Sequence, residues 1–281
     1  MNGVRALREA VRESMASNPG VRLLGEAVEL SAVTAGLASE HPGRVLALPA
    51  SDSALIGVAV GMALGGAIPV VELAGPSSLW GALQQLGQEA SGLGSHPEFS
   101  GTLVVRVPAA PGSIDLGAVV SALPGVRVGV VGQPGEGALL LKAALASRGA
   151  TVIIEPQEVL AQTVSDLAPL SLGSARKLRD GDRVSLLAVG AGVAAALAAA
   201  EQLAAEGIGA DVLDLRGLSP LDEAAIAESV SRTGRVVGVG EARVALNSAV
   251  RGAFLRLEAP PASAGVATDE IVGAARAALA Y

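Results

Sequence analysis

Residues 44–73 read RVLALPASDSALIGVAVGMALGGAIPVVEL, and this stretch indicates the fold. Arg44–Leu48 is a short β-type run, Ser53–Leu64 is an apolar helical run, and Ile68–Leu73 is again a β-type run. Strands that are apolar on both faces and alternate with helices are typical of a parallel sheet covered by helices on both sides. The stretch therefore predicts an α/β fold.

The alternation of strands and helices extends over most of the chain and is interrupted once. It runs from a helix over residues 2–17 to a strand over 151–155, and resumes with a strand at 184–189. Between them lie two prolines, a polar stretch and the charged run RKLRDGD at 176–182. We therefore expect two domains, 1–160 and 183–281, joined by a linker over 161–182.

Composition excludes several classes of function. The 281 residues include no Cys, two His and four aromatic residues, so that a zinc site of Cys and His ligands or a disulfide scaffold is excluded. Twenty Lys and Arg against 27 Asp and Glu give a net charge of −7, which disfavours binding to nucleic acid.

Two uncharged stretches, 53–71 and 184–200, are long enough to raise the question of a membrane span, and the mean hydropathy is +0.52. Gly65, Gly66 and Pro69 divide the first stretch into a helix and a strand, and a Gly-Ala-Gly turn divides the second. We therefore expect buried α/β elements and no membrane span. The charged N-terminal segment lacks the apolar run of a secretory signal, which predicts a cytoplasmic protein.

Two acidic residues lie at the carboxyl ends of predicted strands. Glu26 comes after the strand that begins at Val21, and Asp52 lies between the strand at 44–48 and the apolar helix. Ligands of open α/β sheets bind at the carboxyl ends of the strands. From the residues alone, Asp52 either caps the helix or meets a cationic or N–H group of a ligand.

Residues 24–28, 48–61 and 69–73 resemble, in order and spacing, the pyrimidine-binding domain of thiamine diphosphate enzymes. The closest resemblance is to the beta subunit of the dehydrogenase component of 2-oxoacid (pyruvate or branched-chain) dehydrogenase complexes, and it is strongest at 210–222 and 233–242. It implies two parallel or mixed-sheet domains: a transketolase-like pyrimidine-binding domain followed by a transketolase C-terminal domain.

The resemblance also implies a site and partners. In that family thiamine diphosphate lies between two subunits, and an alpha-type subunit holds the diphosphate and Mg²⁺. This chain has no Gly-Asp-Gly diphosphate motif, in agreement with such a partner. Asp52 stands at the position of the catalytic glutamate, Glu26 would line the cofactor site, and Trp80 would border the ring. The family further implies self-association through the C-terminal domain.

Two departures from the family pattern leave two hypotheses open. Asp52 is one methylene shorter than the family's glutamate, and Gly112 stands where the family has an active-site histidine. The chain is therefore either an active beta-type subunit of a 2-oxoacid dehydrogenase or decarboxylase, or a catalytically inactive paralogue with a structural or regulatory role. A third reading, half of a transketolase-like ketol-transfer enzyme, would also need a partner chain.

Overall fold

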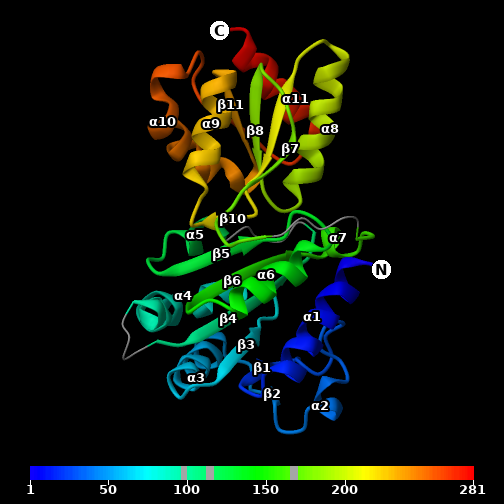
Figure 1. Cartoon of the computed structure of the whole chain (residues 1–281), viewed down its shortest axis with the longest axis vertical. Coiled ribbons are helices and arrows are strands. Elements are labelled where there is room, and N and C mark those ends of the chain that lie inside the picture. Colours follow the sequence, from blue (N-terminus) through cyan, green and yellow to red (C-terminus); the bar gives the residue numbers. More distant parts are fainter. Residues whose placement is uncertain (96–99, 112–116, 165–169) are drawn as a thin grey trace. The chain divides into compact units, whose positions relative to one another are not determined.

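The computed structural model describes residues 1–95, 100–111, 117–164 and 170–281. The chain forms two compact units, Met1–Leu172 and Gly173–Tyr281 (Figure 1). Both consist of a sheet with helices packed against it, so the predicted α/β class with two sheet-containing domains is confirmed. Gly112 lies outside the described residues.

The sheet of unit 1 consists of parallel strands in the order β5-β6-β4-β3-β1-β2. Its central strands are buried on both faces because Val, Leu and Ile occupy successive positions. The strands are β1 (Val21–Gly25), β2 (Val45–Ala47), β3 (Ile68–Glu72), β4 (Thr102–Ala109), β5 (Val126–Val130) and β6 (Gly149–Pro156).

Helices cover both faces of this sheet, with α1 packed on α6 and α3 packed on α4 (Figure 1). The helical segments of unit 1 are α1 (Gly3–Ser17), α2 (Leu37–Glu40), α3 (Asp52–Leu64), α4 (Ser78–Gln88), η1 (Ala90–Gly94), α5 (Gly117–Ser121), α6 (Glu136–Leu145) and α7 (Gln157–Leu160). The sequence predicts a helix over 31–39, but α2 begins only at Leu37. Gly36 has a φ of +83°, which interrupts a right-handed helix.

Unit 2 contains a second sheet, in the order β12-β11-β8-β9-β7. Its strands pair in parallel except β7, which is antiparallel to β9. The strands of this unit are β7 (Arg176–Arg179), β8 (Val184–Ala188), β9 (Ala210–Asp214), β10 (Gly217–Ser219), β11 (Val236–Val239) and β12 (Ala262–Ala264). The charged run that we expected in a linker thus contributes β7, whose charges are compatible with an edge strand.

Two of the helical segments of unit 2, residues 192–205 and 268–279, pack on its sheet around an aliphatic core of Val, Leu, Ile and Ala side chains. The unit has six helical segments in its described residues. They are α8 (Gly192–Ala205), α9 (Glu223–Thr233), η3 (Gly240–Ala245), α10 (Leu246–Ala253), η4 (Phe254–Arg256) and α11 (Thr268–Leu279). Across the described parts of both units, no helix is long and apolar enough to cross a membrane. The cytoplasmic location stays a prediction.

Candidate active site at the carboxyl edge of the first sheet

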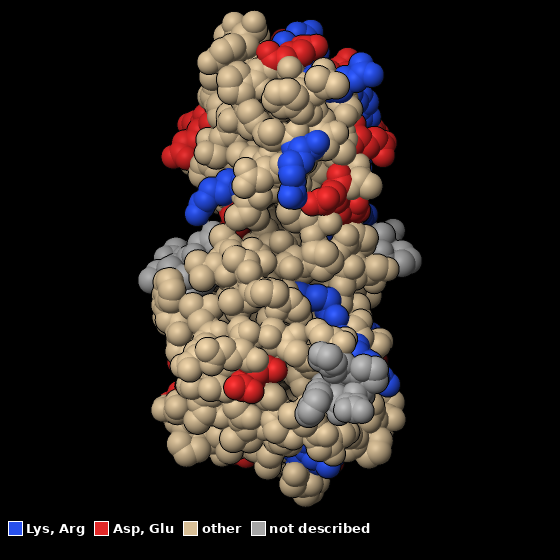
Figure 2. Space-filling view, turned by 90° about the vertical axis from the view of Figure 1, so that its left-hand side faces the viewer, with Lys and Arg blue, Asp and Glu red and all other residues tan. Residues whose placement is uncertain are grey.

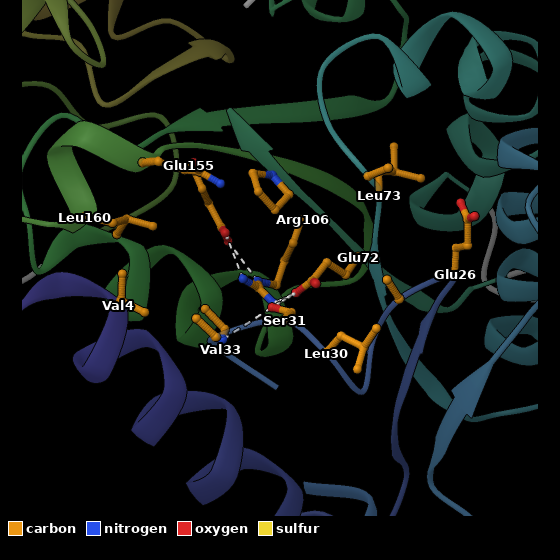
Figure 3. A pocket seen from close by; sticks show the side chains of 15 residues that line it. Val4, Glu26, Leu30, Ser31, Val33, Glu72, Leu73, Arg106, Glu155 and Leu160 are labelled. Atoms are coloured by element: carbon orange, nitrogen blue, oxygen red, sulfur yellow. Dashed lines mark hydrogen bonds and ion pairs between the residues drawn. The ribbon is translucent and has the colours of Figure 1, made fainter. Parts of the chain in front are cut away.

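A cavity of about 590 Å³ lies at the carboxyl ends of β1, β3, β4 and β6 (Figure 3). The chain leaves β1 toward the outer strand β2, and leaves β3 in the opposite direction, toward β4. The neighbouring ends of β1 and β3 thus form a topological switch point, where open α/β sheets bind ligands. The cavity is lined by Val4, Glu26, Ala27, Leu30, Ser31, Ala32, Val33, Glu72, Leu73, Ala74, Arg106, Pro108, Glu155, Gln157 and Leu160.

Arg106 lies between two glutamates that come from the strands on either side of β4. Its Nε and Nη2 each donate a hydrogen bond of 2.8 Å to Glu155, one to each carboxylate oxygen. Its Nη1 lies 2.6 Å from Glu72 Oε2. The sheet register sets this arrangement, because Arg106 is directly opposite Glu72 and Glu155 is opposite the next residue on the same face of β4, Pro108.

The three charged groups are buried to different extents. The side chains of Arg106 and Glu155 are 1% exposed, whereas that of Glu72 is 11% exposed. Burial disfavours the charge of Arg106, but Glu155 and Glu72 outweigh that cost and raise its pKa above the ordinary value. Burial also raises the pKa of Glu155, opposed by the charge of Arg106. The bidentate contact is the geometry of an ionised carboxylate.

A loop after β1 is attached to this cluster through Ser31. The Ser31 hydroxyl donates a 3.0 Å hydrogen bond to Glu72 Oε2 and accepts one of 3.3 Å from the backbone N–H of Val33. The hydroxyl of Thr34 donates to the carbonyl of Val28 within the same loop. These bonds hold the loop over the cavity, so that Leu30 and Val33 contribute to its lining.

Glu26, which we predicted to line a cofactor site, does line this cavity. It follows directly after β1 and its side chain is exposed. Figure 3 shows its carboxylate at the rim, turned away from the cluster of Glu72, Arg106 and Glu155. Its role toward a cofactor stays a prediction.

Asp52 lies at the start of α3 and does not line the cavity. Ser51 caps the helix by accepting a hydrogen bond from the N–H of Ala54, so Asp52 is the first helical residue and does not act as the cap. The half-buried carboxylate has no hydrogen bond or ion pair with the described residues. It is therefore available to a ligand.

Trp80 directly precedes Gly81, the residue of α4 that lies against Asp52. A Cβ at Gly81 would lie 3.0 Å from both Cβ and Oδ2 of Asp52, so a side chain at this position would crowd the carboxylate. Asp52 thus packs against the backbone of α4, and the adjacent Trp80 is 55% exposed. The structure places Asp52 and Trp80 on neighbouring helices, while Glu26 lies at the strand ends.

Sequence reasoning did not single out Ser31, Glu72, Arg106 or Glu155 as site residues. The available signal was one charged residue near the end of each of three apolar strands, in the runs VVEL, VVRV and IIEP. A single charged side chain in a buried strand requires a partner of opposite charge. Three such side chains, two acidic and one basic, therefore predict a cluster. Pairing them required the strand order, which places β4 between β3 and β6.

The structure contains no group of three or more His, Asp or Glu side chains that could hold a metal ion, within the residues that it describes. The diphosphate motif is also absent from the sequence. The acceptor oxygens of Asp52 fit the N–H groups of an aminopyrimidine ring, but the described residues provide no site for the Mg²⁺ that accompanies a diphosphate.

Comparisons with known proteins agree with the two units. Residues 1–74 match the family model of the transketolase pyrimidine-binding domain, and residues 173–280 match that of the transketolase C-terminal domain. A solved split-gene transketolase, in an inactive beta4 tetramer, has the same fold, with a TM-score of 0.84 and 22% identity over 100% of this chain and 98% of that chain.

Similar sequences with curated names are beta subunits. The 2-oxoisovalerate dehydrogenase subunit beta of Bacillus subtilis is 32% identical over 86% of this chain and 79% of its own length. The acetoin:2,6-dichlorophenolindophenol oxidoreductase subunit beta of Cupriavidus necator is 32% identical over 87% of this chain and 80% of its own. This chain therefore belongs to the thiamine-diphosphate-dependent family that includes the beta subunits of 2-oxoacid dehydrogenases and of acetoin oxidoreductase, with transketolase-like pyrimidine-binding and C-terminal domains.

Proposed function

We propose that this chain supplies the aminopyrimidine side of a thiamine diphosphate site that it shares with an alpha-type subunit, in a 2-oxoacid dehydrogenase or decarboxylase. The observation that supports this most directly is the unpartnered carboxylate of Asp52 in the first turn of α3. Glu26 and Trp80 are proposed as further cofactor contacts. Thiamine diphosphate, when bound, supplies the carbon nucleophile that attacks the 2-oxoacid.

In this proposal Asp52 accepts a hydrogen bond from a ring N–H of the aminopyrimidine and holds the ring in one orientation. Gly81 allows the carboxylate to lie close to α4, and the exposed Trp80 offers an apolar surface beside it. Aspartate is shorter than glutamate by one methylene, so we expect slower turnover than with a glutamate at this position.

The alpha-type partner would hold the diphosphate and Mg²⁺. In this proposal the alpha-type partner binds to helices α3 and α4, in which Asp52 is the only charged residue. Val58, Leu64 and Trp80 are exposed on these helices, and Figure 2 shows few charged side chains on the face of unit 1 that it presents. An apolar exposed surface of this kind is typical of a subunit interface.

We also propose self-association through unit 2. Phe254 and Leu255 follow one another in η4 and are 68% and 92% exposed, so that the unit presents an apolar pair to solvent. Sedimentation of the purified full-length chain measures this directly.

The experiment that tests the proposed function is co-expression with an alpha-type chain that carries a Gly-Asp-Gly diphosphate motif, followed by measurement of bound thiamine diphosphate and 2-oxoacid turnover. Asp52→Ala should lower kcat by about 10²-fold or more, the usual contribution of a positioned proton-transfer group. Asp52→Glu should restore or exceed the original turnover. Glu29→Gln, at an exposed acidic residue outside the cavity lining, is the matched control.

The inactive-paralogue hypothesis predicts a different result. It is motivated by Gly112 in place of the family's histidine and by the shorter Asp52. A complex that forms normally but neither retains the cofactor nor turns over any 2-oxoacid, even with Asp52→Glu, would support a structural or regulatory subunit and overturn the catalytic proposal.

A further inference from the structure

The cavity at the switch point carries more negative than positive charge. Three carboxylates line it, those of Glu26, Glu72 and Glu155, against the single guanidinium of Arg106. With all four groups ionised the formal charge of the lining is −2, and its residues include no Lys or His. A cleft lined by one sign of charge attracts ligands of the opposite sign.

This charge argues against an anionic occupant. A 2-oxoacid and a diphosphate are both anions, and each would meet Glu72 in surroundings that screen charge less than water does. Arg106 does not offset this effect, because both glutamates already engage it. The cavity therefore differs in its chemistry from the site that the 2-oxoacid would occupy.

One carboxylate oxygen of the cluster is left for a ligand. Glu72 Oε2 accepts hydrogen bonds from Ser31 and Arg106, whereas Oε1 accepts none from the described residues. Glu72 lines the cavity and is the least buried of the three clustered groups. Apolar side chains surround this polar group, among them Leu30, Val33 and Leu73.

We infer that this cavity binds a small organic cation: a primary amine whose ammonium group pairs with Glu72 Oε1 and whose apolar body packs against Leu30, Val33 and Leu73. A volume of about 590 Å³ lies in the range of small-molecule sites, which combine apolar walls with a few converging polar groups. The site goes beyond the proposed function, since Asp52 and Trp80 do not line it and, of the three proposed cofactor contacts, only Glu26 does so, at the rim.

The test uses 4-phenylbutylamine, which is charged at pH 7, and the neutral 4-phenyl-1-butanol of nearly the same shape. Binding to the purified full-length chain is measured by calorimetry, with no turnover required. The amine should bind at least about tenfold more tightly than the alcohol, since a hydrogen bond to a charged group contributes that much or more. Glu72→Gln should remove this preference, and Glu29→Gln should preserve it.

Two further variants keep the test decisive if Glu72→Gln folds poorly. Ala27→Phe places a ring at an exposed position of the lining, leaves the ion cluster intact, and should weaken amine binding several-fold. Asp52→Asn should leave amine binding unchanged, which separates this site from the proposed cofactor site. Equal affinity for amine and alcohol, or amine binding unaffected by both Glu72→Gln and Ala27→Phe, would overturn the inference.

Discussion

In unit 1 the cluster of Glu72, Arg106 and Glu155 lines a cavity, whereas in unit 2 the buried Asp211 is enclosed by its own partners. Asp211 is 0% exposed. Its Oδ2 accepts a 2.5 Å hydrogen bond from Ser229, and its Oδ1 contacts the backbone N–H of Gly181 and the guanidinium of Arg232.

The two clusters differ in whether a carboxylate oxygen remains without a hydrogen-bond partner. Both oxygens of Asp211 are occupied, and Ser229 continues the network to Ser185, so this cluster has a structural role in the unit 2 sheet. Glu72 Oε1 has no partner among the described residues and faces a cavity. Buried charge alone therefore does not identify a functional site, because a group must also have unused hydrogen-bonding capacity toward open space.

The largest loss in the free energy of unfolding is expected from Arg106→Met. It leaves Glu155 buried without a cation, and breaking a buried ion pair on one side costs about 3–5 kcal/mol. Urea denaturation of the full chain, followed through unit 1, measures the loss. The double variant Arg106→Met with Glu155→Leu should recover part of it. A loss below about 1 kcal/mol, similar to that of a surface control such as Arg148→Met, would contradict the interpretation.

Asp211→Ala should lower the free energy of unfolding by the next largest amount, about 2–3 kcal/mol, because it leaves the buried hydroxyl of Ser229 and the half-buried N–H of Gly181 without this acceptor. The loss should be confined to the unfolding of unit 2. Affinity for 4-phenylbutylamine should stay unchanged, in contrast to Glu72→Gln. A shift in amine binding would mean that the two clusters are not independent.

The fold was largely predictable from the sequence, because its signals are local. The strand, helix and strand of residues 44–73 appear as β2, α3 and β3, with Gly and Pro near the boundaries. One exception is the loop before α2, where Gly36 takes a left-handed conformation that apolar periodicity does not reveal. Another is β7, a charged edge strand that we expected to be part of a linker.

The candidate site was predictable only in part. Asp52 and Glu26 could be identified because each lies shortly after a strand in the sequence, and this signal is local. The cluster of Glu72, Arg106 and Glu155 depends on strand order, and its members are separated by 34 and 49 residues. The Asp52 carboxylate is available because Ser51, and not Asp52, caps the N-terminus of α3. Ser and Asp are both favoured at this capping position, so the sequence did not distinguish them.

The smallest loss of stability is expected from breaking the solvent-exposed ion pair of Glu13 and Lys142, which lie on α1 and α6. A hydrogen bond and the charge of Lys142 hold the pKa of Glu13 below its ordinary value. The pair therefore stabilises the fold above about pH 4, and this contribution is lost as the pH falls through the lowered pKa. Lys142→Ala should reduce stability slightly at pH 7 and not at all near pH 3, and the pH 7 difference should shrink at high salt. A pH-independent loss would instead indicate that Lys142 acts by packing its stem between the two helices, with its charge contributing little.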